Sequence, residues 1–118
     1  MFSRYSVVIL ALAFLVPSST AAQMITDGQS LKKRCDTVQI FMPTSGVGCR
    51  GYIGAIIDVM IDENAIYGYR ACPPQSKKRE DLILAIRSWM EKHPKSLELK
   101  AANAAAQALA ETFPCTTQ

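Results

Sequence analysis

The stretch CRGYIGAIIDVMIDENAIYGYRAC, residues 49–72, organises the rest of the chain. Its apolar residues recur at steps of three and four, the spacing of a helix that buries one face. They are Ile53, Ile56, Ile57, Met60 and Ile61. Acidic residues fall between them and keep the other face wet, and Gly68 supplies a helix end. The stretch therefore predicts a central helix of about five turns, held at each end by a cysteine.

Two glycines lie near the start of this predicted helix. Inside a helix, Gly51 and Gly54 each cost about 1 kcal/mol relative to alanine. Glycine at such a position is typical of a close approach by another part of the chain. We expect a neighbouring backbone or a cysteine to pack against both.

The first 22 of the 118 residues have the composition of a cleaved secretory signal peptide. Arg4 is followed by an apolar run over residues 5–16, and residues 17–22 are proline and small residues. The apolar run is too short to cross a hydrocarbon core of roughly 30 Å as a helix, so a retained membrane anchor is the weaker alternative. We expect cleavage before Gln23, a mature domain over residues 23–118 and a periplasmic location.

Composition limits the classes of partner. The net charge of the whole chain is +3 and falls by one when Arg4 is removed, which is too small to indicate nucleic-acid binding. With 49% hydrophobic residues, the chain fits one small domain with a modest core.

Four cysteines in a small exported domain are typical of two disulfides. They are Cys35, Cys49, Cys72 and Cys115. None forms a closely spaced pair of the kind that binds zinc, so we expect no metal and no cofactor.

Three further segments show helical patterns, which makes the predicted fold an all-α bundle of about four helices. The first covers residues 23–36, with Asp27 or Ser30 as its N-cap. The next begins near Arg79, where two acidic residues suit the helix start, and its predicted buried stripe is Leu82, Ile83, Ile86, Trp89, Met90 and His93. Trp89 fits the core better than an interface.

The last helix follows Pro94 and is expected to return antiparallel, beginning at Leu97. Its many alanines make it narrow, and narrow helices pack closely. Its predicted buried stripe is Leu97, Ala101, Ala105, Leu109 and Phe113.

Helix order in an up-and-down bundle favours one of the three possible disulfide pairings. Cys35 ends the first helix and Cys49 starts the second, whereas Cys72 precedes the third and Cys115 ends the fourth. The expected pairs are therefore Cys35 with Cys49 and Cys72 with Cys115. Loop lengths of roughly 15 and 44 residues give about 3 and about 4 kcal/mol in the chain-entropy model, so the second bridge is expected to contribute more.

The residue types that carry catalysis are scarce. His93 is the only histidine and precedes a proline, where a structural role is the better interpretation. Disulfides leave no thiol nucleophile, and Asp58, Asp62 and Glu63 are expected to be solvated rather than catalytic. The sequence predicts a binding protein and not an enzyme.

Two loops are the candidates for partner binding, because loops held by disulfides commonly carry recognition. The loop of residues 37–48 holds Phe41 and Met42, which should fold over the bundle unless a partner covers them. The turn before the third helix holds Lys77, Lys78 and Arg79; a charged surface of this kind steers a protein partner.

Motifs at both ends of the domain resemble one family, the Rap/Tai immunity proteins. The resemblance is carried by Cys49, Gly51, Tyr52, Ile53, Gly54 and Asp58, by His93 and Pro94, by Ala108 and Leu109, and by Phe113, Pro114 and Cys115. It implies a small exported helical protein, often dimeric, that binds a peptidoglycan amidase effector of the type VI secretion system in the periplasm and blocks its active site. It implies no catalysis. A different class of function stays open: a general periplasmic envelope-stress protein that binds unfolded clients on the same scaffold.

Overall fold

The computed structural model describes residues 24–42, 44–61 and 64–115, and the predicted signal peptide lies outside them. Its elements are α1 (Gly28–Asp36), α2 (Val47–Ile61), α3 (Arg79–Lys92), the 3₁₀ helix η1 (Pro94–Glu98) and α4 (Ala101–Thr112). Within these ranges there is no β-strand, only two isolated bridges. The all-α prediction with four helices is confirmed. None of the helices described is both long and apolar enough to span a membrane.

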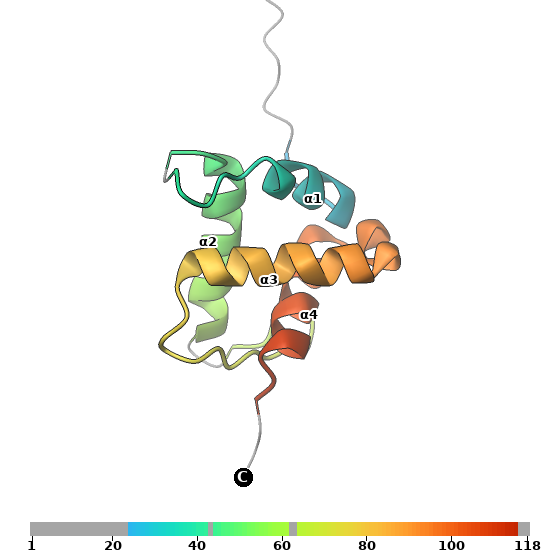
Figure 1. The fold of residues 1–118 in the computed structure, drawn as a ribbon. Helices are drawn as coiled ribbons and strands as arrows, with labels where there is room; N and C mark the ends of the chain where they lie inside the picture. The colour runs from blue at the N-terminus through green and yellow to red at the C-terminus, as the bar shows by residue number, and fades with distance from the viewer. Residues whose placement is uncertain (1–23, 43, 62–63, 116–118) are drawn as a thin grey trace, which may run out of the picture.

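The helices cross one another instead of running up and down side by side. In Figure 1, α3 passes in front of α2 at a steep angle, α1 lies across the top, and α4 packs behind α3. The residues at the end of α4 show the same departure from an antiparallel return. Glu111 in its last turn lies beside Trp89 and His93 at the end of α3, whereas an antiparallel return would place it near the start of α3.

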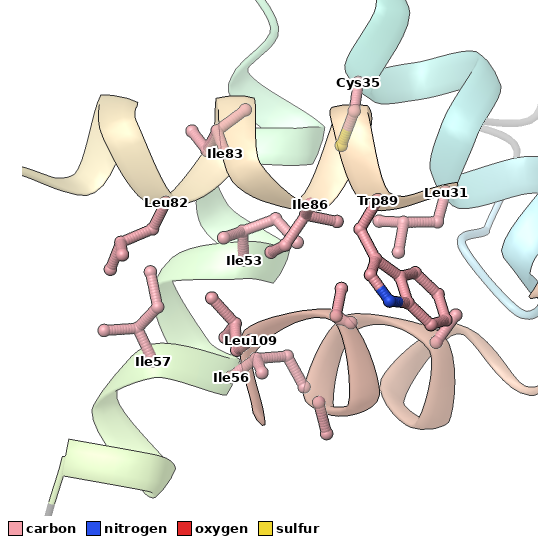
Figure 2. Close-up of a cluster of buried hydrophobic side chains, with 14 of the residues drawn as sticks. Leu31, Cys35, Ile53, Ile56, Ile57, Leu82, Ile83, Ile86, Trp89 and Leu109 are labelled. Carbon is pink, nitrogen blue, oxygen red and sulfur yellow. The ribbon is translucent and has the colours of Figure 1, made fainter. Parts of the chain in front are cut away.

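Side chains from all four helices form one apolar core (Figure 2). Ile53 of α2 lies beside Ile86 of α3, and Ile56 of α2 lies near Leu109 of α4. The α4 residues buried in this core are mainly alanines, which allow the helices to approach closely: Ala101, Ala104, Ala105, Ala106 and Ala108. The predicted stripe of α4 is buried at Ala101, Ala105 and Leu109, while Leu97 precedes the helix in η1 and is only half-buried, as is Phe113.

The central helix is shorter than its apolar pattern predicts. It ends by Ile61, whose side chain is 61% exposed although it falls on the predicted stripe. Gly68 does not end this helix. It has a φ of +79° in a separate tight turn, where Ile66 and Tyr69 exchange backbone hydrogen bonds of 3.1 and 2.9 Å. The spacing of the isoleucines predicted a buried face up to Ile61, but the apolar core ends before that residue.

The glycine prediction is half right. A Cβ at Gly51 would meet nothing within 4 Å, whereas one at Gly54 would lie 2.9 Å from Nη1 of Arg79. The neighbour at Gly54 is thus a guanidinium group and not a backbone or a cysteine.

A third glycine makes the closest contact of this kind, at the start of α1. A Cβ at Gly28 would lie 2.0 Å from the carbonyl oxygen of Ser96 in η1, so no larger residue fits there. The Gly28 amide donates to the Leu99 carbonyl at 2.8 Å, and the Ala101 amide donates to the Thr26 carbonyl at 3.1 Å. These bonds attach the beginning of α1 to the link between α3 and α4.

Trp89 is buried in the core, as predicted, but its indole also takes part in a polar cluster. Its Nε1–H donates to Glu111, and its ring stacks on His93 with centroids 4.2 Å apart. The hydrogen bond from Trp89, with a second from Gln107, holds the pKa of Glu111 below its ordinary value. His93 caps α3 and is exposed, so it does not belong to the buried stripe on which we placed it.

Both predicted disulfides are confirmed, Cys35–Cys49 and Cys72–Cys115. Their surroundings differ. Cys35 and Cys49 are each 1% exposed within the core, whereas Cys72 and Cys115 are both exposed.

Burial reverses the stability ranking that loop length alone predicts. Replacing Cys35 and Cys49 by serine removes about 3 kcal/mol of chain-entropy stabilisation and also places two hydroxyl groups in the core, at about 1–3 kcal/mol for each one left without a partner. Replacing Cys72 and Cys115 by serine costs about 4 kcal/mol and buries no polar group. We expect the Cys35→Ser/Cys49→Ser variant to show the lower melting temperature by circular dichroism. The reverse order would mean that loop length decides.

The lowered pKa of Glu111 predicts a pH-dependent contribution to stability. A carboxyl group whose pKa is depressed on folding stabilises the folded state above its unfolded pKa, and this contribution is lost as the pH falls through the folded value. Glu111→Gln should therefore lower the melting temperature at pH 7 by more than at pH 3. Fluorescence of Trp89, the only tryptophan, can follow unfolding. A difference that does not change with pH would show that the charge of Glu111 contributes nothing.

Candidate functional site

The part of the chain described holds no cluster of three or more His, Cys, Asp or Glu residues able to bind a metal ion. His93 is engaged at the end of α3, where its Nδ1 lies 2.7 Å from the Trp89 carbonyl. Asp58 lies 3.9 Å from Nη2 of Arg79, while Asp62 and Glu63 lie outside the described residues. The candidate site therefore consists of the two loops predicted for partner binding.

The loop between α1 and α2 exposes an aromatic residue. Phe41 is 97% exposed and Met42 is 51% exposed, so these two side chains do not fold over the bundle as expected. Among the described residues of this loop, Val38 alone is buried, and it packs against Gly46, where a Cβ would lie 2.2 Å from Cγ2 of Val38. Val38 thus anchors the loop while Phe41 projects from it.

The guanidinium group of Arg50 bonds to several carbonyl groups of this loop, and Arg87 of α3 donates to one more, that of Val38, at 3.4 Å. Nε of Arg50, in the first turn of α2, donates to the Ser45 carbonyl at 2.8 Å. Its Nη2 lies within reach of three more loop carbonyls: Gln39 at 3.1 Å, Met42 at 3.4 Å and Ile40 at 3.5 Å. Only 12% of the Arg50 side chain is exposed, so its guanidinium group bonds mainly to the loop backbone and little to solvent.

Arg50 also connects the loop to α3. Its Nη1 donates to Oε1 of Glu80, in the first turn of α3, at 3.1 Å. The basic turn directly precedes Glu80 in the chain, and Figure 1 shows both loops on the side of the molecule where α2 lies. The two segments chosen from the sequence are therefore linked through one ion pair.

The three residues of the basic turn are all exposed, but they do not have the same role. Arg79 lies over Gly54 and faces Asp58 of α2, so it helps to position the start of α3. Lys77 and Arg79 also line a groove of about 550 Å³ between the second half of α2 and the segment before α3. Arg79 is therefore engaged with α2, and Lys77 and Lys78 are the two charges of this turn that we assign to partner binding.

Arg50 was not among the predicted site residues, although the sequence carries a signal for it. A positive charge in the first turn of a helix opposes the helix dipole. Arg50 lies in the first turn of α2 and so is unfavourable there. The unfavourable position of this charge is explained by the hydrogen bonds that Arg50 donates to the loop.

Loss of the Arg50 side chain should loosen the loop around Phe41. Arg50→Met removes the donors for four loop carbonyls and leaves the apolar stem of the side chain in place. Chymotrypsin cleaves after exposed aromatic residues in mobile segments, so cleavage after Phe41 should become at least about tenfold faster, as expected when about 1.4 kcal/mol or more of local stabilisation is lost.

Lys32→Met is the matched control, because Lys32 pairs with Asp36, four residues along the same helix, and among the described residues no hydrogen bond or ion pair joins it to the loop. Equal cleavage rates in the two variants would contradict the role of Arg50.

The family model of the Rap1a immunity proteins matches residues 27–115. No curated protein and no solved structure matches the chain. The matched region runs from the N-cap of α1 to the last cysteine and so includes all four helices, both disulfides and both candidate loops. Because it covers most of the chain, the protein belongs to the Rap1a immunity protein family.

Proposed function

We propose that this protein binds and inhibits a peptidoglycan amidase effector of the type VI secretion system in the periplasm. The family points to an immunity protein that acts on a secreted effector protein. The amidase target comes from the resemblance of the motifs around Cys49 and Cys115, and the periplasmic location is supported by the predicted signal peptide and by two disulfides. In this function the protein acts by contact and carries out no reaction.

The observation that carries the proposal is the exposure of Phe41 and its neighbour Met42 on a loop whose backbone is held in place. A pair of exposed apolar side chains, one of them an aromatic ring that is 97% exposed, offers a partner apolar area to bury, and aromatic residues are common anchors of interfaces. The bonds of Arg50 to the loop reduce the entropy that is lost when a partner orders it. Lys77 and Lys78 add positive charge near the same side of the molecule, which would steer an acidic rim of the effector.

The test measures inhibition of hydrolysis of purified peptidoglycan by a panel of type VI amidases, with residues 23–118 as the inhibitor. Phe41→Ala should weaken inhibition of the cognate enzyme by at least about 2 kcal/mol, about thirtyfold in Kd, if Phe41 is an anchor residue. Met24→Ala is the matched control, since Met24 is also highly exposed and lies before α1, away from the loop.

Charge reversal tests the second segment. Lys77→Glu/Lys78→Glu should weaken binding and flatten its dependence on salt, whereas Lys92→Glu/Lys95→Glu, with the same change in charge on the end of α3 and on η1, should not. Arg79 is left unchanged because it contacts α2. Equal effects of the two pairs would remove the basic turn from the interface.

The client-binding alternative is supported by the number of other exposed apolar side chains, among them Val47, Ile61 and Tyr67. If no amidase is inhibited and the purified protein instead suppresses aggregation of acid- or heat-denatured clients, the alternative replaces the proposal.

A further inference from the structure

The two disulfides differ in their access to reagents. Cys35–Cys49 is enclosed by the core, and an incoming thiol cannot reach its sulfur atoms without opening the helices. Cys72 and Cys115 are exposed, at the end of a loop segment and just after α4. Thiol–disulfide exchange requires direct approach of a thiolate to sulfur, so access alone separates the two bonds.

The groove beside α2 adds a second difference. Cys72 lines it together with Lys77, Arg79 and Asp58; Asp58 faces Arg79 at 3.9 Å, so Lys77 is the positive charge that the groove adds. Positive charge stabilises a thiolate, and a stabilised thiolate is the better leaving group in exchange. Cys115 does not line the groove, so the two sulfurs of the bond have different surroundings.

We propose that Cys72–Cys115 is a thiol–disulfide exchange site, reduced by an external dithiol while Cys35–Cys49 stays oxidised. A thiolate of the dithiol attacks Sγ of Cys115, the sulfur–sulfur bond breaks, and Cys72 leaves as a thiolate in the groove that Lys77 also lines. The second thiolate of the dithiol then attacks the other sulfur of the same dithiol, which is bonded to Cys115 in the mixed disulfide. This closes the dithiol into a disulfide and releases Cys115 as a thiolate. Two electrons pass to the protein, the dithiol becomes a disulfide, and two protons are taken up where the new thiolates are protonated.

The reduced protein keeps the two sulfurs close together. The Cys72 amide donates to the Phe113 carbonyl at 2.8 Å, which joins the two segments independently of the disulfide. Ala71 is buried on one side of this bond, and Phe113 packs against the core on the other. Reduction therefore leaves a folded domain that an oxidant can close again, and exchange at this site is reversible.

The experiment treats residues 23–118 with increasing dithiothreitol, blocks new thiols with N-ethylmaleimide and maps the modified peptides by mass spectrometry. We expect Cys72 and Cys115 to be modified at least about tenfold faster than Cys35 and Cys49, with Trp89 fluorescence unchanged. Modification of all four cysteines at one rate, or first at Cys35 and Cys49, overturns the proposal. So does loss of the Trp89 signal together with the first disulfide, because reduction would then be unfolding.

Two further measurements test the role of the groove. Oxidised glutathione added to the reduced site should form a mixed disulfide first at Cys72, because the stabilised thiolate is the more abundant nucleophile. Lys77→Gln should slow reduction by dithiothreitol by a factor of about two to five without changing the melting temperature, whereas Lys95→Gln, on η1, should leave the rate unchanged. Equal slowing by both substitutions would contradict a specific effect of the groove.

Discussion

The arrangement of the other three α-helices depends on the small side chains of α4, which allow them to pack close to its backbone. A short domain has few large residues to bury, and this one gains its packing by close approach instead of bulk. Five alanines of α4 are almost completely buried, and α4 packs against each of the other three α-helices. A methyl group is all that separates the α4 backbone from its neighbours at these positions. Steeply crossed helices can therefore share a single core in which Ile53, Ile83 and Leu109 are fully enclosed.

The loop proposed for partner binding is fixed by contacts with the core and with two helix starts. The inner end of the loop of residues 37–46 is fixed by Val38, and its carbonyls are fixed by Arg50. The same guanidinium reaches Glu80, so the shape of the loop depends on where α3 begins. Arg79 adds a second contact between α3 and α2, over Gly54. The side that we propose for effector binding is thus set by two arginines at two helix starts.

Local patterns in the sequence predicted most of the fold. The end of α1, its N-cap Asp27, the position of α3, the buried stripe around Ile86 and the order of the disulfides all follow from periodicity, capping and chain order, which are properties of neighbouring residues. The start of α1 was predicted too early, at residue 23 instead of Gly28. The other errors concern tertiary geometry. Periodicity could not show that the core ends before Ile61, and an antiparallel link after Pro94 is only the simplest connection, so neither the crossing of α4 nor the position of Glu111 beside Trp89 could be deduced.

The candidate site was predicted in part for the same reason. Phe41, Met42 and the basic turn were chosen by residue type and loop position, and the structure places them in exposed segments. What joins them is a set of long-range bonds from Arg50 to carbonyl groups, and carbonyl groups are common to every residue. No side-chain pattern marks the partners of such bonds, so only the unfavourable charge of Arg50 at its helix start was visible in the sequence.

The pairing of the cysteines has a consequence for how the domain matures. The two disulfide loops follow one another along the chain and do not interlock, with separations of 14 and 43 residues. A chain that is oxidised in the order in which its cysteines emerge makes Cys35–Cys49 first and Cys72–Cys115 second, and each bond formed this way is native. Oxidation in this order forms no wrong pair that would have to be reshuffled before the domain reaches its native pairing.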